Sequence, residues 1–97
     1  MISDEDFLRL FNTAMALAKP VGKSTIKAES IDIRFEEIEV DSLDLLIIGM
    51  YLCDAFAISE EKGKEMRPET VAQMKEFLIE HAGISTIDVD AVLQVMA

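Results

Sequence analysis

The sequence contains no tryptophan, one cysteine (Cys53), one histidine (His81) and only two prolines in 97 residues. A single cysteine cannot form a disulfide within the chain, and Cys53 and His81 alone cannot supply the ligands of a structural zinc site. The longest uncharged apolar run, Leu45 to Cys53, is far shorter than the roughly 18–20 residues that cross a bilayer. We therefore expect no internal disulfide, no metal site and no membrane insertion.

Positive charge is also scarce, with nine Lys and Arg residues against 19 Asp and Glu residues, for a formal net charge of −10. Such a surface repels the phosphates of nucleic acids and anionic membranes. The first six residues include three acidic residues and no basic one, whereas a secretory signal begins with basic residues. We predict a cytoplasmic protein that does not bind nucleic acid and whose partners carry basic patches.

Apolar residues, by contrast, make up 51% of the chain, and its mean hydropathy is positive. This composition excludes a disordered acidic tail despite the charge. A chain of this length corresponds to one domain with a modest core.

The first 20 residues show a helical pattern. Ser3 is a suitable N-cap, and the three acidic residues after it suit the positive end of the helix dipole. Lys19-Pro20 ends the pattern, because proline disfavours helical geometry in the residue before it. The apolar residues at helical spacing are Phe7, Leu10, Phe11, Ala14, Met15 and Ala18.

Residues 20–41 form a long acidic connection whose apolar residues have no sustained period. Residues 31–35 alternate between apolar and charged types, as a short strand would. A lone strand has no pairing partner in this chain, so we expect an ordered loop that apolar side chains hold in place. These side chains are Val21, Ile26, Ile31, Ile33, Phe35 and Ile38.

Three further helices and a helical tail follow. The second helix begins at Asp41-Ser42, ends near Phe56 and is apolar on nearly all sides. Ser59 caps a short helix, and another helix runs from near Thr70 to a stop at Gly83. In the tail, Ser85 and Asp88 together can cap a last helix, whose apolar side is Val89, Val92, Leu93 and Met96.

The predicted fold is therefore all-α. Three main helices and one short helix form a bundle over residues 1–82, and residues 83–97 add a C-terminal helical extension. We expect this extension to pack on the bundle, partly over the second helix.

The most informative motif is Asp41-Ser42-Leu43, which lies where the acidic loop meets the apolar second helix. Here the sequence resembles the acyl carrier proteins, in which the serine of an Asp-Ser-Leu motif accepts a 4'-phosphopantetheine arm from coenzyme A. The resemblance covers residues 2 to about 82 in the order and spacing of the helices. The tail beyond lies outside the family's usual pattern.

The resemblance implies an acyl-carrier-like four-helix bundle that is not an enzyme. It implies that Ser42 carries 4'-phosphopantetheine and that the protein presents acyl thioesters to enzymes of fatty acid, polyketide or other lipid metabolism. The implied partners are a phosphopantetheinyl transferase and acyl-transferring or condensing enzymes with basic patches. The protein itself is expected to be a monomer. The residues it implies for partner recognition are Asp41, Leu43, Asp44 and Asp54.

The chemistry of this position is consistent with an acceptor. A phosphodiester on a serine at a helix start meets free backbone N–H groups and the positive end of the helix dipole. No histidine or lysine lies beside Ser42 in the sequence, and His81 belongs to a different element. A catalytic serine needs a base and a group that orients it, so we interpret Ser42 as an acceptor that another enzyme modifies.

Three departures from the family indicate a specialised carrier. Glu39 stands where the family often has glycine, so the entry into the second helix is expected to differ. Gly49 stands where a larger aliphatic residue is usual, and its cost of up to about 1 kcal/mol relative to alanine predicts a packing or cavity reason. Apolar residues also occupy much of the usually acidic face of the second helix: Leu45, Ile47, Tyr51 and Cys53.

Two other functions fit the same residues. A helical interaction module without the arm would use the apolar second helix as a docking face. A carrier of aminoacyl or peptidyl groups would also use Ser42, although the acidic residue before it makes the motif less similar to those carriers.

Overall fold

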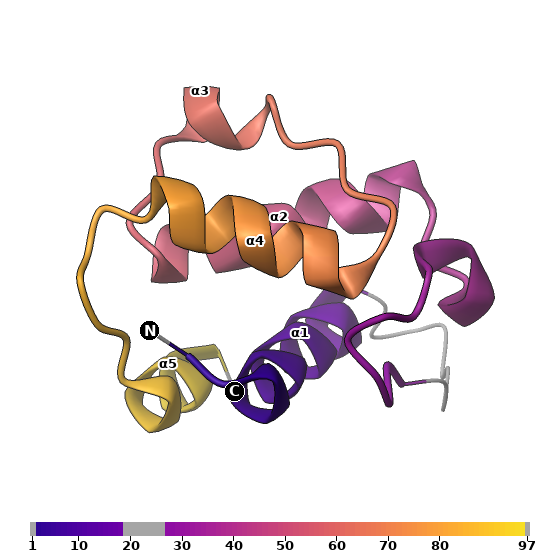
Figure 1. Cartoon of the computed structure of the whole chain (residues 1–97), viewed down its shortest axis with the longest axis horizontal. Coiled ribbons are helices and arrows are strands. Elements are labelled where there is room, and N and C mark those ends of the chain that lie inside the picture. The colour runs from indigo at the N-terminus through magenta and orange to yellow at the C-terminus, as the bar shows by residue number, and fades with distance from the viewer. Residues whose placement is uncertain (1, 19–26, 97) are drawn as a thin grey trace.

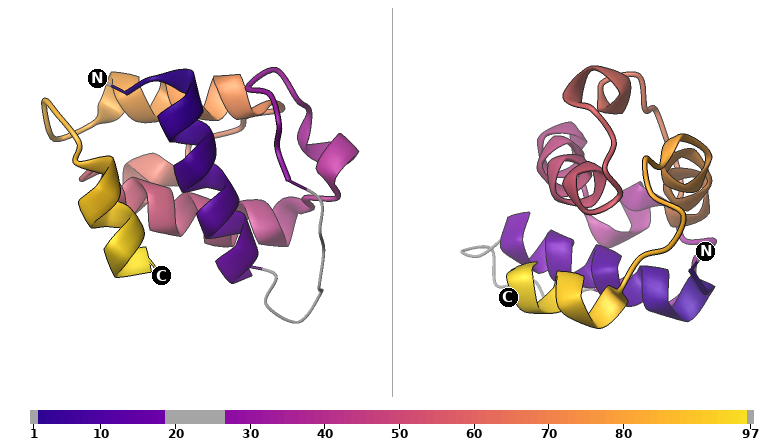
Figure 2. Two further views of the ribbon diagram at one scale, coloured as in Figure 1. Left: turned by 90° about the horizontal axis from the view of Figure 1, so that it is seen from below. Right: turned by 90° about the vertical axis from the view of Figure 1, so that its left-hand side faces the viewer.

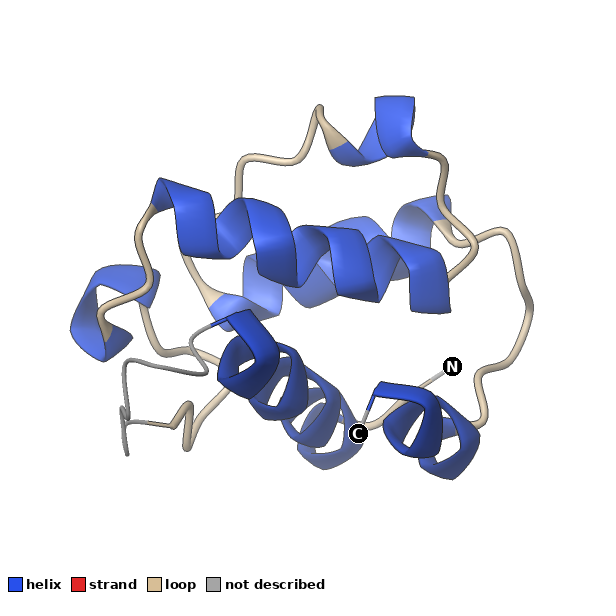
Figure 3. Ribbon diagram, turned by 180° about the vertical axis from the view of Figure 1, so that it is seen from behind, coloured by secondary structure: helices blue, strands red, loops and turns tan. Residues whose placement is uncertain are grey.

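A computed structural model of the chain describes residues 2–18 and 27–96. Its elements are helices α1 (Asp4–Ala18), α2 (Ser42–Ala55), α3 (Glu60–Gly63), α4 (Val71–His81) and α5 (Val89–Met96), with a short 3-10 helix η1 (Phe35–Ile38) before α2. The described residues contain no β-strand (Figure 3), and the prediction of an all-α helical bundle is confirmed. None of the described helices has the length and apolarity that crossing a membrane requires.

The helices begin close to the predicted residues, and side-chain caps mark their starts. The side chains of Ser3, Ser59 and Thr70 each accept the backbone N–H three residues on, at 3.1, 3.2 and 3.1 Å. In the tail the cap is Asp88, whose carboxylate accepts the N–H of Ala91 at 3.2 Å. Local capping therefore sets these boundaries. The predicted stop at Lys19-Pro20 lies outside the described residues.

Helix α1 lies across α2 and α4 and supplies the centre of the core (Figures 1 and 2). Phe7 and Phe11 are fully buried. The Phe7 ring meets Phe56 edge-on at a centroid distance of 6.3 Å, and the Phe11 ring stacks on Phe35 at 5.7 Å. Five residues of the predicted stripe are buried, and the sixth, Ala18, is partly buried against the core: Phe7, Leu10, Phe11, Ala14 and Met15 are the buried five.

The connection before α2 is ordered where it is described. Asn12 of α1 bonds both backbone groups of Ala28, at 3.0 and 2.8 Å. Arg34 forms an isolated antiparallel bridge with Thr70, next to hydrogen bonds from the first residues of α4 to the loop. The alternating segment thus has a pairing partner after all, in the residues that lead into α4. Val21 and Ile26 lie outside the described residues.

The end of α2 contacts the end of α4. Ala57 has φ 57°, and Ile58 and Ala57 donate to the carbonyl groups of Cys53 and Asp54 at 2.8 and 3.2 Å, a Schellman motif. The N–H of Gly83 donates to the carbonyl of Phe56 at 3.0 Å.

The role of Gly83 differs from the predicted one. Helix α4 already ends at His81, and Gly83 does not have a positive φ. A Cβ atom at position 83 would lie 2.5 Å from the carbonyl oxygen of Ala57. Glycine is therefore needed here for close approach of two backbone segments.

The tail helix α5 packs on the bundle as predicted, but chiefly against α1 and not chiefly over α2 (Figure 2). The reason is that α1 offers it both an apolar surface and a cation, Arg9, which pairs with Asp90 at 3.2 Å. The α5 residues packed against the core are the predicted ones: Val89, Val92, Leu93 and Met96.

Ala57→Gly is expected to raise the free energy of unfolding by up to about 1 kcal/mol, because alanine is strained at positive φ and glycine is not. Ala16→Gly, at an exposed position inside α1, is the matched control and should lower it by about 0.5–1 kcal/mol. Urea unfolding followed by circular dichroism measures both. Effects of the same sign would contradict the assigned turn conformation.

Candidate functional site

Ser42 is the first residue of α2, and its side chain is exposed. The preceding Asp41 is the N-cap, and its carboxylate accepts the N–H of Asp44 at 2.8 Å. In return the Asp44 carboxylate accepts the N–H of Asp41 at 3.4 Å. This reciprocal capping box fixes the backbone on both sides of the serine.

The first turn of α2 presents backbone donors beside the Ser42 hydroxyl. The first intrahelical bond runs from the N–H of Leu45 to the carbonyl of Asp41 at 2.9 Å. The N–H groups of Ser42 and Leu43 precede it, so no acceptor inside the helix is available to them. Together with the helix dipole they favour an anion on the serine oxygen.

The turn into α2 adopts the conformation that glycine favours, although the residue there is Glu39. Its backbone angles are φ 57° and ψ 34°, in the left-handed region. It follows η1, and the next N–H, that of Val40, donates to the carbonyl of Phe35 at 3.0 Å. The residue at position 39 is therefore not glycine, but its backbone has the left-handed conformation that glycine favours. The chain turns sharply there into Asp41.

A hollow of about 330 Å³ adjoins Ser42, between the loop before α2 and the residues that lead into α4. It is lined by exposed polar residues and by buried or half-buried apolar residues. The polar residues are Arg34, Glu36, Asp41, Ser42 and Glu69, and the apolar ones are Phe35, Val40, Leu45 and Pro68. The volume falls at the lower end of the range of small-molecule sites, about 300–1,000 Å³.

Arg34 joins the two sides of this hollow. Its guanidinium bonds Glu36 at 3.1 Å and Glu69 at 3.3 Å. These carboxylates, Glu36 first, raise the pKa of the arginine above its usual value. The arginine thus links the loop before Ser42 to the residue before the α4 cap.

The exposed apolar face of α2 differs from the predicted one. Cys53 is buried and Leu45 and Ile47 are half-buried, while Tyr51 is 39% exposed. Because α2 is apolar on nearly all sides, the spacing alone could not show which side faces the core. Three other residues are exposed and lie on one side at helical spacing, and we call them the α2 stripe: Leu43 (63%), Leu46 (56%) and Met50 (62%).

The predicted recognition residues lie at two places along α2. Asp41, Leu43 and Asp44 surround Ser42 in the first turn. Asp54 is exposed near the other end, about 18 Å away at the usual helical rise of about 1.5 Å per residue. Asp54 follows Met50 by four residues, so it extends the α2 stripe with a negative charge.

The titratable residues around the hollow in the described part of the chain are carboxylates and one arginine. The residues around the hollow include no histidine or lysine. His81 is the last residue of α4, and its ring contacts that of Phe77 at a centroid distance of 4.5 Å. Across residues 2–18 and 27–96, no group of three or more His, Cys, Asp and Glu side chains could hold a metal ion.

Gly49 has a packing explanation. It is buried in the middle of α2, and a Cβ atom there would lie 3.2 Å from the terminal methyl carbon of Met66. The Met66 side chain therefore fills the space that a larger residue at position 49 would occupy. Sequence reasoning identified the position but not this partner, which lies 17 residues away.

No family model, curated protein or solved structure matches the chain.

Cys53 makes the free energy of unfolding depend on pH in the alkaline range. Burial raises the pKa of its thiol above the usual value of 9.0. Below that value both the folded and the unfolded chain hold a neutral thiol. As the pH rises through it, the unfolded chain releases its proton first, and the free energy of unfolding falls.

We expect Cys53 in the folded chain at pH 8 to react with iodoacetamide more than about tenfold more slowly than in urea-unfolded chain. The wild type should also lose more stability than Cys53→Ala between pH 8 and 10. Equal rates in the two states, or identical pH profiles for wild type and variant, would contradict the buried thiol.

Proposed function

We propose that this protein is a carrier of the acyl carrier type, which holds acyl groups as thioesters on a 4'-phosphopantetheine arm at Ser42. The observation that carries the proposal is the placement of Ser42. Its exposed hydroxyl lies between reciprocally capping aspartates in the first turn of an apolar helix, beside a hollow of about 330 Å³.

The residues around Ser42 suit the arm. The first-turn N–H groups of α2 favour its phosphodiester, and the apolar and polar lining of the hollow suits a chain that alternates alkyl and amide groups. When attached, the arm supplies a terminal thiol that carries the acyl group. In the proposed transfer, a base of the transferase takes the Ser42 proton while the serine oxygen bonds to phosphorus and adenosine 3',5'-bisphosphate leaves coenzyme A.

The α2 stripe supports presentation of cargo to enzymes. It begins next to Ser42 and is bordered by Asp44 and Asp54, in a chain of net charge −10. The complementary surface is an apolar groove with a basic rim. The same stripe favours the second candidate function, a helical interaction module without the arm, and a carrier of aminoacyl or peptidyl groups would use the same serine.

Incubation of the protein with coenzyme A and a broad-specificity phosphopantetheinyl transferase tests the proposal. We expect the intact mass to increase by one 4'-phosphopantetheine group. Ser42→Ala should abolish this gain and keep its helicity, because Asp41 still caps α2. Ser85→Ala, at an exposed serine in the tail connection, is the matched control and should be modified normally.

The mass spectrum also separates the candidates. No gain for the wild type would contradict the carrier and favour the interaction module, and a gain for Ser42→Ala would assign the arm to another residue. The mass of the cargo on protein purified from its native host distinguishes acyl from aminoacyl or peptidyl groups.

Asp44→Lys is expected to slow modification severalfold at low ionic strength and less at high ionic strength, because it replaces a negative charge beside the acceptor. Glu80→Lys makes the same charge reversal near the far end of α4 and should have little effect. Initial rates at two salt concentrations measure this. Since Asp44 also caps α2, thermal unfolding of both variants is the control for stability. Equal slowing by both variants would contradict steering at α2.

A further inference from the structure

The fully buried residues of the core all lie outside the tail helix. All of the buried core residues in the described chain lie between Phe7 and Leu78, and α5 contains no buried residue. Its four apolar residues that reach the core are only partly buried, and Val95 is 87% exposed. Helix α5 therefore lies at the edge of a core whose buried residues all come from other segments.

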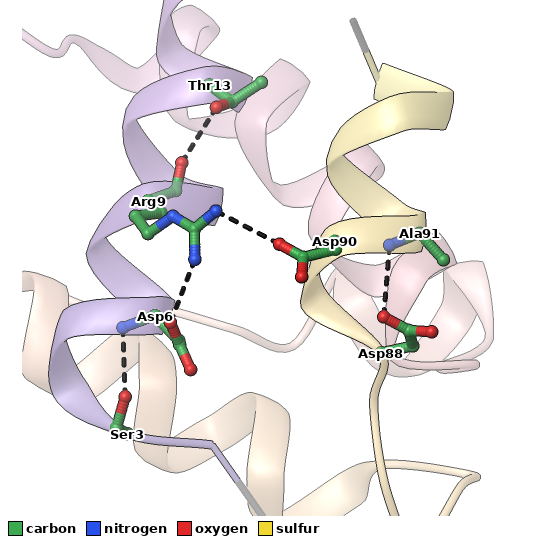
Figure 4. A network of polar contacts seen from close by, with 7 residues as sticks. All are labelled: Ser3, Asp6, Arg9, Thr13, Asp88, Asp90 and Ala91. Atoms are coloured by element: carbon green, nitrogen blue, oxygen red, sulfur yellow. Dashed lines mark hydrogen bonds and ion pairs between the residues drawn. The ribbon is translucent and has the colours of Figure 1, made fainter.

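The polar attachment of α5 is a single exposed ion pair among the described residues. Arg9 of α1 bonds Asp90 of α5 and Asp6 of α1, each at 3.2 Å (Figure 4). The Asp90 side chain is 81% exposed, so water competes for this pair. Asp88 bonds within α5 itself, as its cap. The apolar contact with α1 therefore contributes more than the ion pair to the stability of α5 on the bundle.

The chain before α5 is anchored at Gly83, contacts the core again through Ile87, and then continues into α5 beside α1. Gly83 is fixed against the end of α2 by its bond to Phe56 and its close approach to Ala57. Residues 84–88 then lead to α5 without a helix or strand. Figures 1 and 2 place α5 at the end of the bundle away from the start of α2. Movement of α5 about residues 84–88 thus leaves the surroundings of Ser42 in place.

We propose that α5 is a detachable cover. It dissociates from α1 as one unit while the rest of the bundle stays folded. Segments that contribute few buried contacts open at lower free energy than the global core. Opening exposes apolar surface on α1 and on α5 together. This inference concerns the tail alone and is independent of modification at Ser42.

Amide hydrogen exchange of the full chain, read by mass spectrometry, tests the proposal. We expect the α5 amides to exchange at least about tenfold faster than the buried stretch of α1 between Leu10 and Met15. Val92→Asp places a charge in the contact with α1 and should remove the protection of α5 while α1, α2 and α4 keep theirs. Val95→Asp, on the exposed side of the same helix, is the matched control and should leave α5 protected.

A second pair of variants tests the ion pair between Arg9 and Asp90. Neither variant introduces a charge into the apolar contact between α5 and α1. Asp90→Asn should speed exchange of α5 about 1.5- to 5-fold. Asp4→Asn removes the ion pair between α1 and Lys75 of α4 and should leave α5 exchange unchanged. The proposal is overturned if α5 exchanges as slowly as the core of α1, or if Val92→Asp unfolds the whole bundle while Val95→Asp does not.

Discussion

The apolar face of α1 is the constraint on which the rest of the structure depends. Its two phenylalanine rings reach opposite parts of the chain, since Phe7 meets Phe56 at the end of α2 and Phe11 stacks on Phe35 in the loop before α2. Both ends of α2 are thereby located against one helix. Loss of a buried phenylalanine side chain typically costs about 3–5 kcal/mol, a large share of the roughly 5–15 kcal/mol that stabilises a small domain. The position of Ser42 is thus a consequence of packing on α1.

The charges around Ser42 serve the fold and the proposed function together. Asp41 and Asp44 bond each other's backbone N–H groups, so their carboxylates are held in place at the start of α2. Arg34 likewise connects the loop to the residue before the α4 cap through Glu69. A partner enzyme that bound these carboxylates would find their side chains already in place. Binding would therefore cost less conformational entropy.

Features set by neighbouring residues were predictable from the sequence. Ser3, Ser59 and Thr70 cap helices because each side chain reaches an N–H three residues away, and the apolar period of α1 identifies its buried face. The exposed side of α2 was not predictable, since a helix that is apolar all round carries no directional signal. The place of α5 and the bridge from Arg34 to Thr70 depend on distant contacts that local patterns do not encode.

At the site, the sequence predicted the cap and the exposed serine. The hollow beside it, which needs Pro68 and Glu69 from another segment, was not predictable.

The contact between Gly49 and Met66 has an evolutionary consequence. The two residues share one volume, because the methyl group of one occupies the space that a side chain on the other would need. Neighbours of this kind do not change independently. Relatives of this protein that carry a larger residue at position 49 should therefore carry a shorter one at position 66, and the two positions should vary as a pair.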